Sequence, residues 1–80
     1  MKARVHVTLK TGVLDPQGKA IETALHGLGF AGVSGVHTGK LIEFTIDETD
    51  RAKAEAQVRQ MAEKLLANTV IEKYAVEITG

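Results

Sequence analysis

The chain has 80 residues, 44% of them hydrophobic, which fits one small globular domain over residues 1–80. Ten basic residues balance ten acidic ones, which argues against a nucleic-acid binder that relies on excess positive charge. The absence of cysteine excludes a disulfide framework, a thiolate metal site and a cysteine nucleophile. No stretch resembles a signal peptide or reaches transmembrane length, so we expect a cytoplasmic protein with no membrane contact.

Apolar and polar side chains alternate over residues 2–10, which predicts a half-buried strand. A helix is expected to follow from Asp15 to Leu28, with Asp15 as its N-cap and Pro16 at the first helical position. Gly29 is suited to the left-handed position that ends the helix. The predicted apolar stripe of this helix has i, i+3, i+4 and i+7 spacing and consists of Ile21, Ala24, Leu25 and Leu28.

Gly18 falls in the first turn of this helix, where helix formation does not require a glycine. Its bare backbone is open to three interpretations, namely a structural cap, an anion site or a surface for a partner. The anion alternative uses the turns at Gly12, Gly18 and Gly39, with Lys10 and Lys40 as counter-charges.

Residues 31–47 predict two short strands joined by a tight turn at Thr38-Gly39-Lys40. Gly32 and Gly35 weaken the first of these strands and suggest a bulge or a sheet edge. The second strand is better formed and has three inward-facing side chains, Ile42, Phe44 and Ile46.

A second helix is predicted to begin after an N-cap at Thr49 or Asp50 and to end near Ala67-Asn68, with Asn68 in the left-handed position. Its expected apolar stripe is Ala54, Val58, Met61, Ala62 and Leu65. A last strand is expected over Val70–Thr79, and its apolar face is Tyr74, Val76 and Ile78.

The predicted order is β-α-β-β-α-β, which gives an α+β, two-layer sandwich of ferredoxin-like topology. Both helices would cover one face of an antiparallel four-stranded sheet. The other face would be bare, which in a small neutral domain favours a homodimer or docking on a larger protein. We expect the homodimer face to include His6, Thr8, Leu41, Glu43 and Thr45.

Nothing in the chain has the pattern of a catalytic or metal site. The three histidines lack the spacing of metal ligands, and no Ser-His-Asp arrangement is indicated. The acidic cluster from Asp47 to Asp50 is explained by helix capping. An RNA-binding function is rejected because the chain has only three aromatic residues and no basic surface. A regulatory module that binds a small metabolite is left open.

Four stretches, in chain order, resemble the PurS family and together cover nearly the whole chain. They are Gly12–Gly18 followed by Ala24-Leu25, Leu28-Gly29-Phe30 with Val33, Gly39-Lys40 with Glu43, and Lys64–Tyr74. The Leu-Asp-Pro-Gln-Gly block and the Leu-Leu-Ala-Asn block are the specific parts of this match. The chain departs from many members at His37-Thr38, where an arginine is common, and at Thr69, where proline is common.

The resemblance implies a small accessory subunit of phosphoribosylformylglycinamidine synthase, a ligase of purine biosynthesis. It implies a homodimer, or a tetramer, that holds together a large synthetase subunit (PurL) and a glutaminase subunit (PurQ) and helps to enclose the path of ammonia. ATP and magnesium would bind the synthetase subunit, and no catalytic group, cofactor or metal is expected in this chain.

The positions carried over from the family are taken as assembly and surface-shaping residues. They are Asp15, Pro16, Gln17, Gly18, Lys40, Leu66, Ala67, Asn68 and Glu72. The alternative to an assembly subunit is a free-standing regulatory module that binds a small metabolite.

Overall fold

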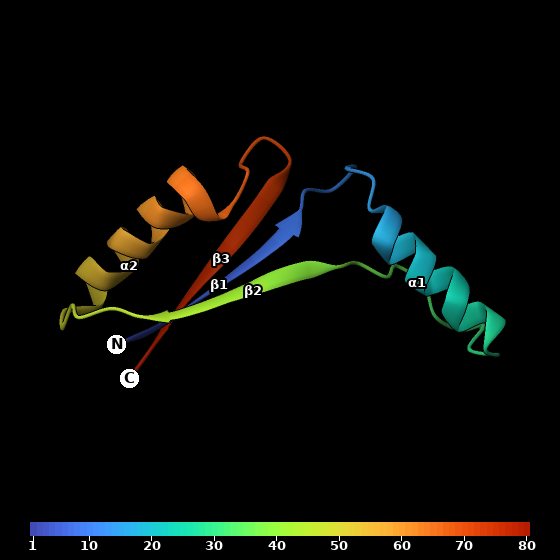
Figure 1. Cartoon of the computed structure of the whole chain (residues 1–80), viewed down its shortest axis with the longest axis horizontal. Coiled ribbons are helices and arrows are strands. Elements are labelled where there is room, and N and C mark those ends of the chain that lie inside the picture. The colour runs from blue at the N-terminus through green and yellow to red at the C-terminus, as the bar shows by residue number, and fades with distance from the viewer.

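The computed structural model describes all residues from 1 to 80 and contains three strands and two helices (Figure 1). Its elements are β1 (Lys2–Leu9), α1 (Pro16–Gly27), β2 (Gly39–Thr45), α2 (Arg51–Met61), a π-helical turn η1 (Ala62–Leu66) and β3 (Glu72–Thr79). The strands form one antiparallel sheet in the order β2-β1-β3, so β1 lies in the centre. No helix combines the length and the apolar character that crossing a membrane requires.

The core lies between the sheet and α2. In β1, Ala3, Val5 and Val7 are buried, while the residues between them are exposed, as the alternation predicts. The register places Val5 beside Ile42 of β2 and Val76 of β3, so the predicted inward faces of all three strands are confirmed. The buried hydrophobic residues are Ala3, Val5, Val7, Ala54, Val58, Ala62, Ala67 and Ile78.

The prediction of a four-stranded sheet is wrong, because residues 31–38 form no strand. Gly35 has a φ of +67°, a conformation that an extended strand does not use. The predicted tight turn at Gly39 is also wrong, since Gly39 opens β2 and pairs with Thr8. The element order otherwise agrees with the predicted one.

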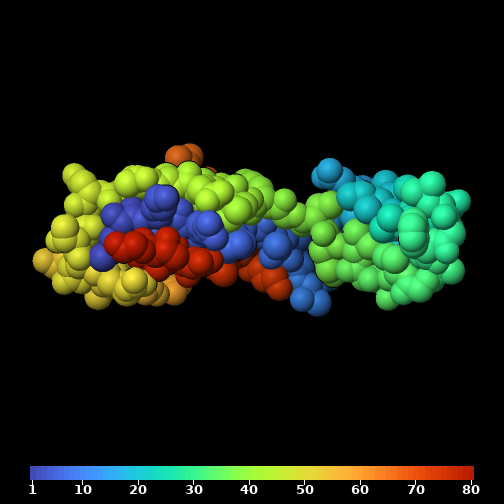
Figure 2. All heavy atoms as spheres, turned by 90° about the horizontal axis from the view of Figure 1, so that it is seen from below, coloured from blue at the N-terminus to red at the C-terminus, as the bar shows by residue number.

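The prediction that both helices cover one face of the sheet is also wrong. In Figure 1, α2 lies over the sheet, whereas α1 lies beyond the end of the strands. We call residues 11–38 the arm and the remaining residues the body. Figure 2 shows the arm as a separate lobe, and the strands of the body uncovered on the side away from α2. The Cα radius of gyration is 16.0 Å, whereas about 12 Å is usual for a compact chain of this length.

The end of α2 differs from the prediction because the helix changes its period. The Ala67 N–H donates to the carbonyl of Ala62, five residues back, at 2.9 Å. This π-type turn rotates the following residues, so Leu65 points outward with 83% exposure while Leu66 packs against the core. Asn68 is not in the left-handed conformation, since no residue other than glycine has a positive φ.

The two helix starts follow the sequence signals. Asp50 is the N-cap of α2, and its carboxylate accepts from the N–H groups of Ala52 and Lys53. The first turn of α2 is also attached to the sheet, because Arg51 Nη1 donates to the carbonyl of Ile78 at 2.6 Å. At the other helix, Gly29 (φ +98°) ends α1, and the N–H of Phe30 reaches back to the carbonyl of Leu25.

Candidate functional site

Asp15 connects the two chain segments that join the arm to the body. Its Oδ1 accepts from the Gly18 N–H at 2.9 Å, which confirms the predicted N-cap. Its Oδ2 accepts from the Thr38 N–H at 2.8 Å, and the Thr38 hydroxyl lies 3.0 Å from both carboxylate oxygens. Hydrogen bonds from the backbone N–H of Gly18, which has the larger effect, and from that of Thr38 hold the pKa of Asp15 below its ordinary value. One carboxylate therefore binds the start of α1 to the segment that enters β2.

Gly18 has a structural role that the sequence did not reveal. A Cβ at this position would lie 2.5 Å from the Val36 carbonyl oxygen and 2.7 Å from Oδ2 of Asp15. Gly18 is also the buried residue of α1. The expectation that the fold does not require a glycine here is therefore wrong, because the arm's own backbone comes this close.

The polar side of α1 faces the arm's own backbone. Glu22 Oε1 accepts from the Val36 N–H at 3.3 Å, and His26 Nε2 lies 2.6 Å from the Val33 carbonyl oxygen, to which it donates when protonated there. The Val36 N–H, followed by Lys19, lowers the pKa of Glu22. His26 thus holds the returning segment, and sequence reasoning missed Glu22 and Thr38.

Five of the positions carried over from the family resemblance gather around one shallow pocket between the arm and the body. Its lining includes Asp15, Pro16, Gln17, Lys40 and Glu72. These residues come from the start of α1, the start of β2 and the start of β3, so the tertiary structure brings three distant parts of the sequence together.

Leu66, Ala67 and Asn68, which the family resemblance also singles out, lie outside this pocket and have contacts within the chain. Leu66 and Ala67 pack in or against the core. Asn68 and Glu72 form a closed turn, since the Asn68 N–H donates to Glu72 Oε1 and the Glu72 N–H donates to the Asn68 carbonyl, each at 2.7 Å.

The residues of the anion alternative are not brought together. Lys10 and Gly12 line a pocket with His37 and Lys73, whereas Lys40 lines the pocket described above. The carboxylate of Asp15 borders both pockets, and a negative charge there opposes anion binding. Nor does the chain contain a group of three or more histidine, aspartate or glutamate side chains arranged to hold a metal ion.

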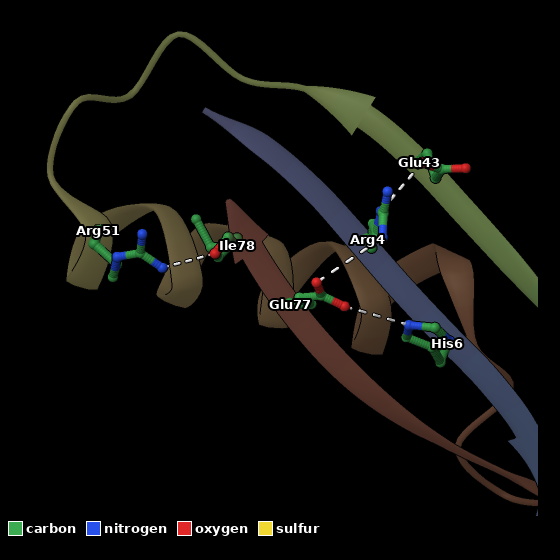
Figure 3. Close-up of polar contacts among 6 residues, drawn as sticks. All are labelled: Arg4, His6, Glu43, Arg51, Glu77 and Ile78. Atoms are coloured by element: carbon green, nitrogen blue, oxygen red, sulfur yellow. Dashed lines mark hydrogen bonds and ion pairs between the residues drawn. The ribbon is translucent and has the colours of Figure 1, made fainter. Parts of the chain in front are cut away.

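The uncovered face of the sheet carries a network of charged side chains (Figure 3). Arg4 lies between two carboxylates, with Nε 3.2 Å from Glu43 and Nη1 3.9 Å from Glu77. His6 Nε2 lies 3.7 Å from the second oxygen of Glu77. The residues expected on the homodimer face do share this face in the register, and they are His6, Thr8, Leu41, Glu43 and Thr45. The face is more ionic than predicted, because Arg4 was not counted among them.

Apart from Leu41, which is 49% exposed on that face, the most exposed apolar side chains lie elsewhere. On the arm, Leu14 is 80% exposed, Leu28 73% and Phe30 57%. On the body, Leu65 and Val70 are exposed near the π-helical turn. Large exposed apolar side chains that gather into one patch are typical of a surface that binds another protein.

Comparison with known proteins gives a consistent result. A family model described as "PurS: Phosphoribosylformylglycinamidine (FGAM) synthase" matches residues 2–80. The chain is 51% identical over 77 residues to a phosphoribosylformylglycinamidine synthase subunit PurS from a Synechocystis species, covering 96% of this chain and 77% of that protein. It is 49% identical over 77 residues to the Bacillus subtilis subunit of the same name, covering 96% and 90% of the two chains.

Solved structures agree with these relatives. The structure of Bacillus subtilis PurS has a TM-score of 0.87 at 48% identity and covers 99% of this chain and 98% of that one. A chain of the PurLQS structure from Thermotoga maritima has a TM-score of 0.87 at 32% identity and covers 95% and 93%. A further Thermotoga maritima structure is described as the purS subunit of phosphoribosylformylglycinamidine synthase, EC 6.3.5.3.

Proposed function

This chain belongs to the PurS family of phosphoribosylformylglycinamidine synthase subunits, and we propose that it holds the synthetase subunit (PurL) and the glutaminase subunit (PurQ) together. In this function it acts as a homodimer, or as a tetramer of two such dimers, in the cytoplasm. It contributes no catalytic group and helps to enclose the path along which ammonia passes. ATP and magnesium bind the synthetase subunit.

The observation that carries this proposal is the set of large apolar side chains that a single copy leaves exposed. Leu14, Leu28 and Phe30 of the arm and Leu65 and Val70 of the body are each more than half exposed. Burial of apolar area is the main driving force of protein association. An elongated chain with exposed apolar side chains on both its arm and its body is suited to contact more than one neighbour.

The pocket between the arm and the body is the proposed contact site for a partner subunit. It is lined by Lys40 and Glu72 of the body and by Pro16 and Gln17 of the arm, and all four are residues that the family resemblance singles out. The opposite charges of Lys40 and Glu72 offer hydrogen bonds and ion pairs that orient a partner. A partner bound there would touch both parts of the chain at once.

Reconstitution of the synthase tests this function. The purified synthetase and glutaminase subunits are assayed with and without this chain, using either glutamine or free ammonia as the nitrogen source. We expect glutamine-dependent turnover to require the chain and ammonia-dependent turnover to need it far less. Unchanged glutamine-dependent turnover in its absence would refute the proposal.

A charge reversal tests the proposed contact site. Lys40→Glu should weaken co-elution of this chain with the two other subunits, because it removes the positive side of the pocket. Lys53→Glu, on an exposed position of α2, is the matched control and should co-elute normally. Equal effects of both variants would show that the pocket is not part of the contact site.

A further inference from the structure

A second pocket lies where the arm joins the body, beside the proposed contact site, and we call it the cationic pocket. Its volume of about 280 Å³ suits a small chemical group. It shares only Lys10 and Gly12 with the anion site considered from the sequence. Its lining is rich in hydrogen-bond donors and includes Thr8, Lys10, Thr11, Gly12, His37 and Lys73.

Two lysines of the cationic pocket lie close together without a counter-charge. Lys73 is opposite Thr8 in the register of β1 and β3. The Lys10 N–H donates to the carbonyl of Ile71 at 2.9 Å, which continues the same ladder and makes Lys10 a diagonal neighbour of Lys73. Neither lysine forms an ion pair within the chain. Like charges on neighbouring strands repel, and an anion between them would remove that repulsion.

The carboxylates nearest to these lysines are bound elsewhere. Asp15 is the one acidic residue on the lining, and its two oxygens accept from donors of Gly18 and Thr38. Glu72, at the start of β3, accepts from the Asn68 N–H at 2.7 Å. The charge of Asp15 therefore weakens the positive potential of the pocket, but the two lysines outnumber it.

The turn that follows β1 adds backbone donors to the cationic pocket. The Val13 N–H donates to the carbonyl of Lys10 at 3.1 Å and Gly12 has a φ of +89°, which together close a β-turn. The N–H groups of Thr11 and Gly12, at the centre of this turn, take part in no hydrogen bond within the chain. Successive free N–H groups of this kind are typical of anion-binding concavities.

We propose that the cationic pocket binds a small oxyanion of the phosphate type. Lys10 and Lys73 supply the positive charge, and the N–H groups of Thr11 and Gly12 donate hydrogen bonds. His37, near the end of the arm, adds a donor from a third segment of the chain. A phosphate dianion balances both ammonium groups, whereas a carboxylate carries a single charge. Because these donors belong to the arm and to the body, the bound anion would hold the two parts together.

Titration of the purified chain with sodium phosphate tests this inference. The ionic strength is kept constant with sodium chloride, and backbone amide shifts are followed by NMR. We expect saturable shifts at Thr11, Gly12 and Lys73, with a dissociation constant of about 1 mM or below. Acetate should bind at least about tenfold more weakly, because it carries one charge.

Charge variants test whether the lysines of the pocket hold the anion. Lys10→Gln and Lys73→Gln should each weaken phosphate binding by about tenfold, since each removes a charge-assisted hydrogen bond. Lys53→Gln removes the same charge from an exposed position of α2 outside the pocket and should leave binding unchanged. His37→Arg places a permanent cation on the lining and should tighten binding. Circular dichroism of each variant checks that the chain is folded.

Three results would overturn the inference. They are amide shifts that do not saturate, shifts that lie outside the cationic pocket, and an equal loss of binding in Lys53→Gln and the two pocket variants. Methyl phosphate, titrated in parallel, identifies the form of the ligand. Tighter binding of methyl phosphate would assign the pocket to a phosphorylated metabolite, and tighter binding of inorganic phosphate would assign it to the free ion. These measurements use the chain alone, so they do not depend on the proposed assembly function.

Discussion

The body and the arm are stabilised by different kinds of interaction. In the body, Val5, Val58, Ala54 and Ala62 are no more than 1% exposed and pack side chain against side chain. In the arm the buried residue is Gly18, which has no side chain, and the structure is held by carboxylates that accept from backbone N–H groups. A region without a core of its own depends on a few polar contacts, and it gains further stability when a partner covers its apolar side.

The largest effect is expected from Val58→Ala in the body. Removing two methyl groups from a fully buried side chain should lower the free energy of unfolding by about 2 kcal/mol, because transfer and cavity costs add. Urea denaturation measures this loss. The control is Gln57→Ala on the exposed side of α2, which should change stability by less than about 0.5 kcal/mol. A similar loss for both variants would contradict a core centred on α2.

Gly18→Ala should be the most damaging single change in the arm. The added Cβ would meet the Val36 carbonyl and the Asp15 carboxylate, and we expect a loss of about 1 to 2 kcal/mol from this crowding. Faster hydrogen exchange at the amides of Val36 and Thr38 would report it. Gly27→Ala is the matched control in the same helix, since nothing lies within 4 Å of its Cβ position, and it should stabilise α1 slightly. Equal behaviour of the two variants would show that residue 36 does not crowd α1.

Acid should loosen the arm before the body. The pKa of Asp15 is lower in the folded chain than its ordinary value of 3.8. Its contribution is therefore fully present above about pH 4 and is lost as the pH falls through the lowered pKa. The amide shifts of Gly18 and Thr38, followed by NMR, should change in this range while that of Val5 stays constant. Asp15→Asn should abolish the pH dependence, and a common transition of all three amides would argue against an independent arm.

The smallest effect is expected from a change at the surface of the body, in the hydrogen bond between Tyr74 and Glu63. The Tyr74 hydroxyl donates to Glu63 Oε1 at 2.8 Å, and this bond raises the pKa of Tyr74 above 10.0. A raised pKa gives a contribution that is present below the unfolded value and is lost as the pH rises through the folded one. Glu63→Gln should bring the pKa of Tyr74 back toward its ordinary value, measured by ultraviolet absorbance. An unchanged titration would mean that Glu63 does not hold the hydroxyl.

Local sequence patterns predicted the structure correctly wherever it depends on residues that are close together in the sequence. Alternation placed Ala3, Val5 and Val7 correctly because strand side chains point to opposite faces by geometry alone. Asp15 and Gly29 were assigned correctly as helix ends, and Asp50 is one of the two N-caps predicted for α2, since capping acts within a few residues. The prediction of a strand at residues 31–38 was wrong because backbone groups of this segment are bound by side chains of α1. Strand propensity does not predict such contacts with another element.

The candidate contact positions were predictable only in part. The resemblance singled out Asp15, Lys40 and Glu72, but only the fold shows that they border one pocket. Leu65 was assigned to the core because a regular helix would bury it, and the π-helical turn moved it outward. The role of Thr38 had no local signal, because its partner Asp15 is 23 residues away.

The sequence by itself determined three of the four expected strands, the two helices, their N-caps and the family. These depend on side-chain periodicity, on hydrogen bonds within one turn and on specific residue blocks. Only the tertiary structure decided that α1 leaves the sheet, that Gly18 is needed where Val36 approaches, and that the apolar stripe of α1 faces solvent. The physical reason is that an amphipathic pattern requires a covering surface without specifying which segment, or which copy of the chain, provides it.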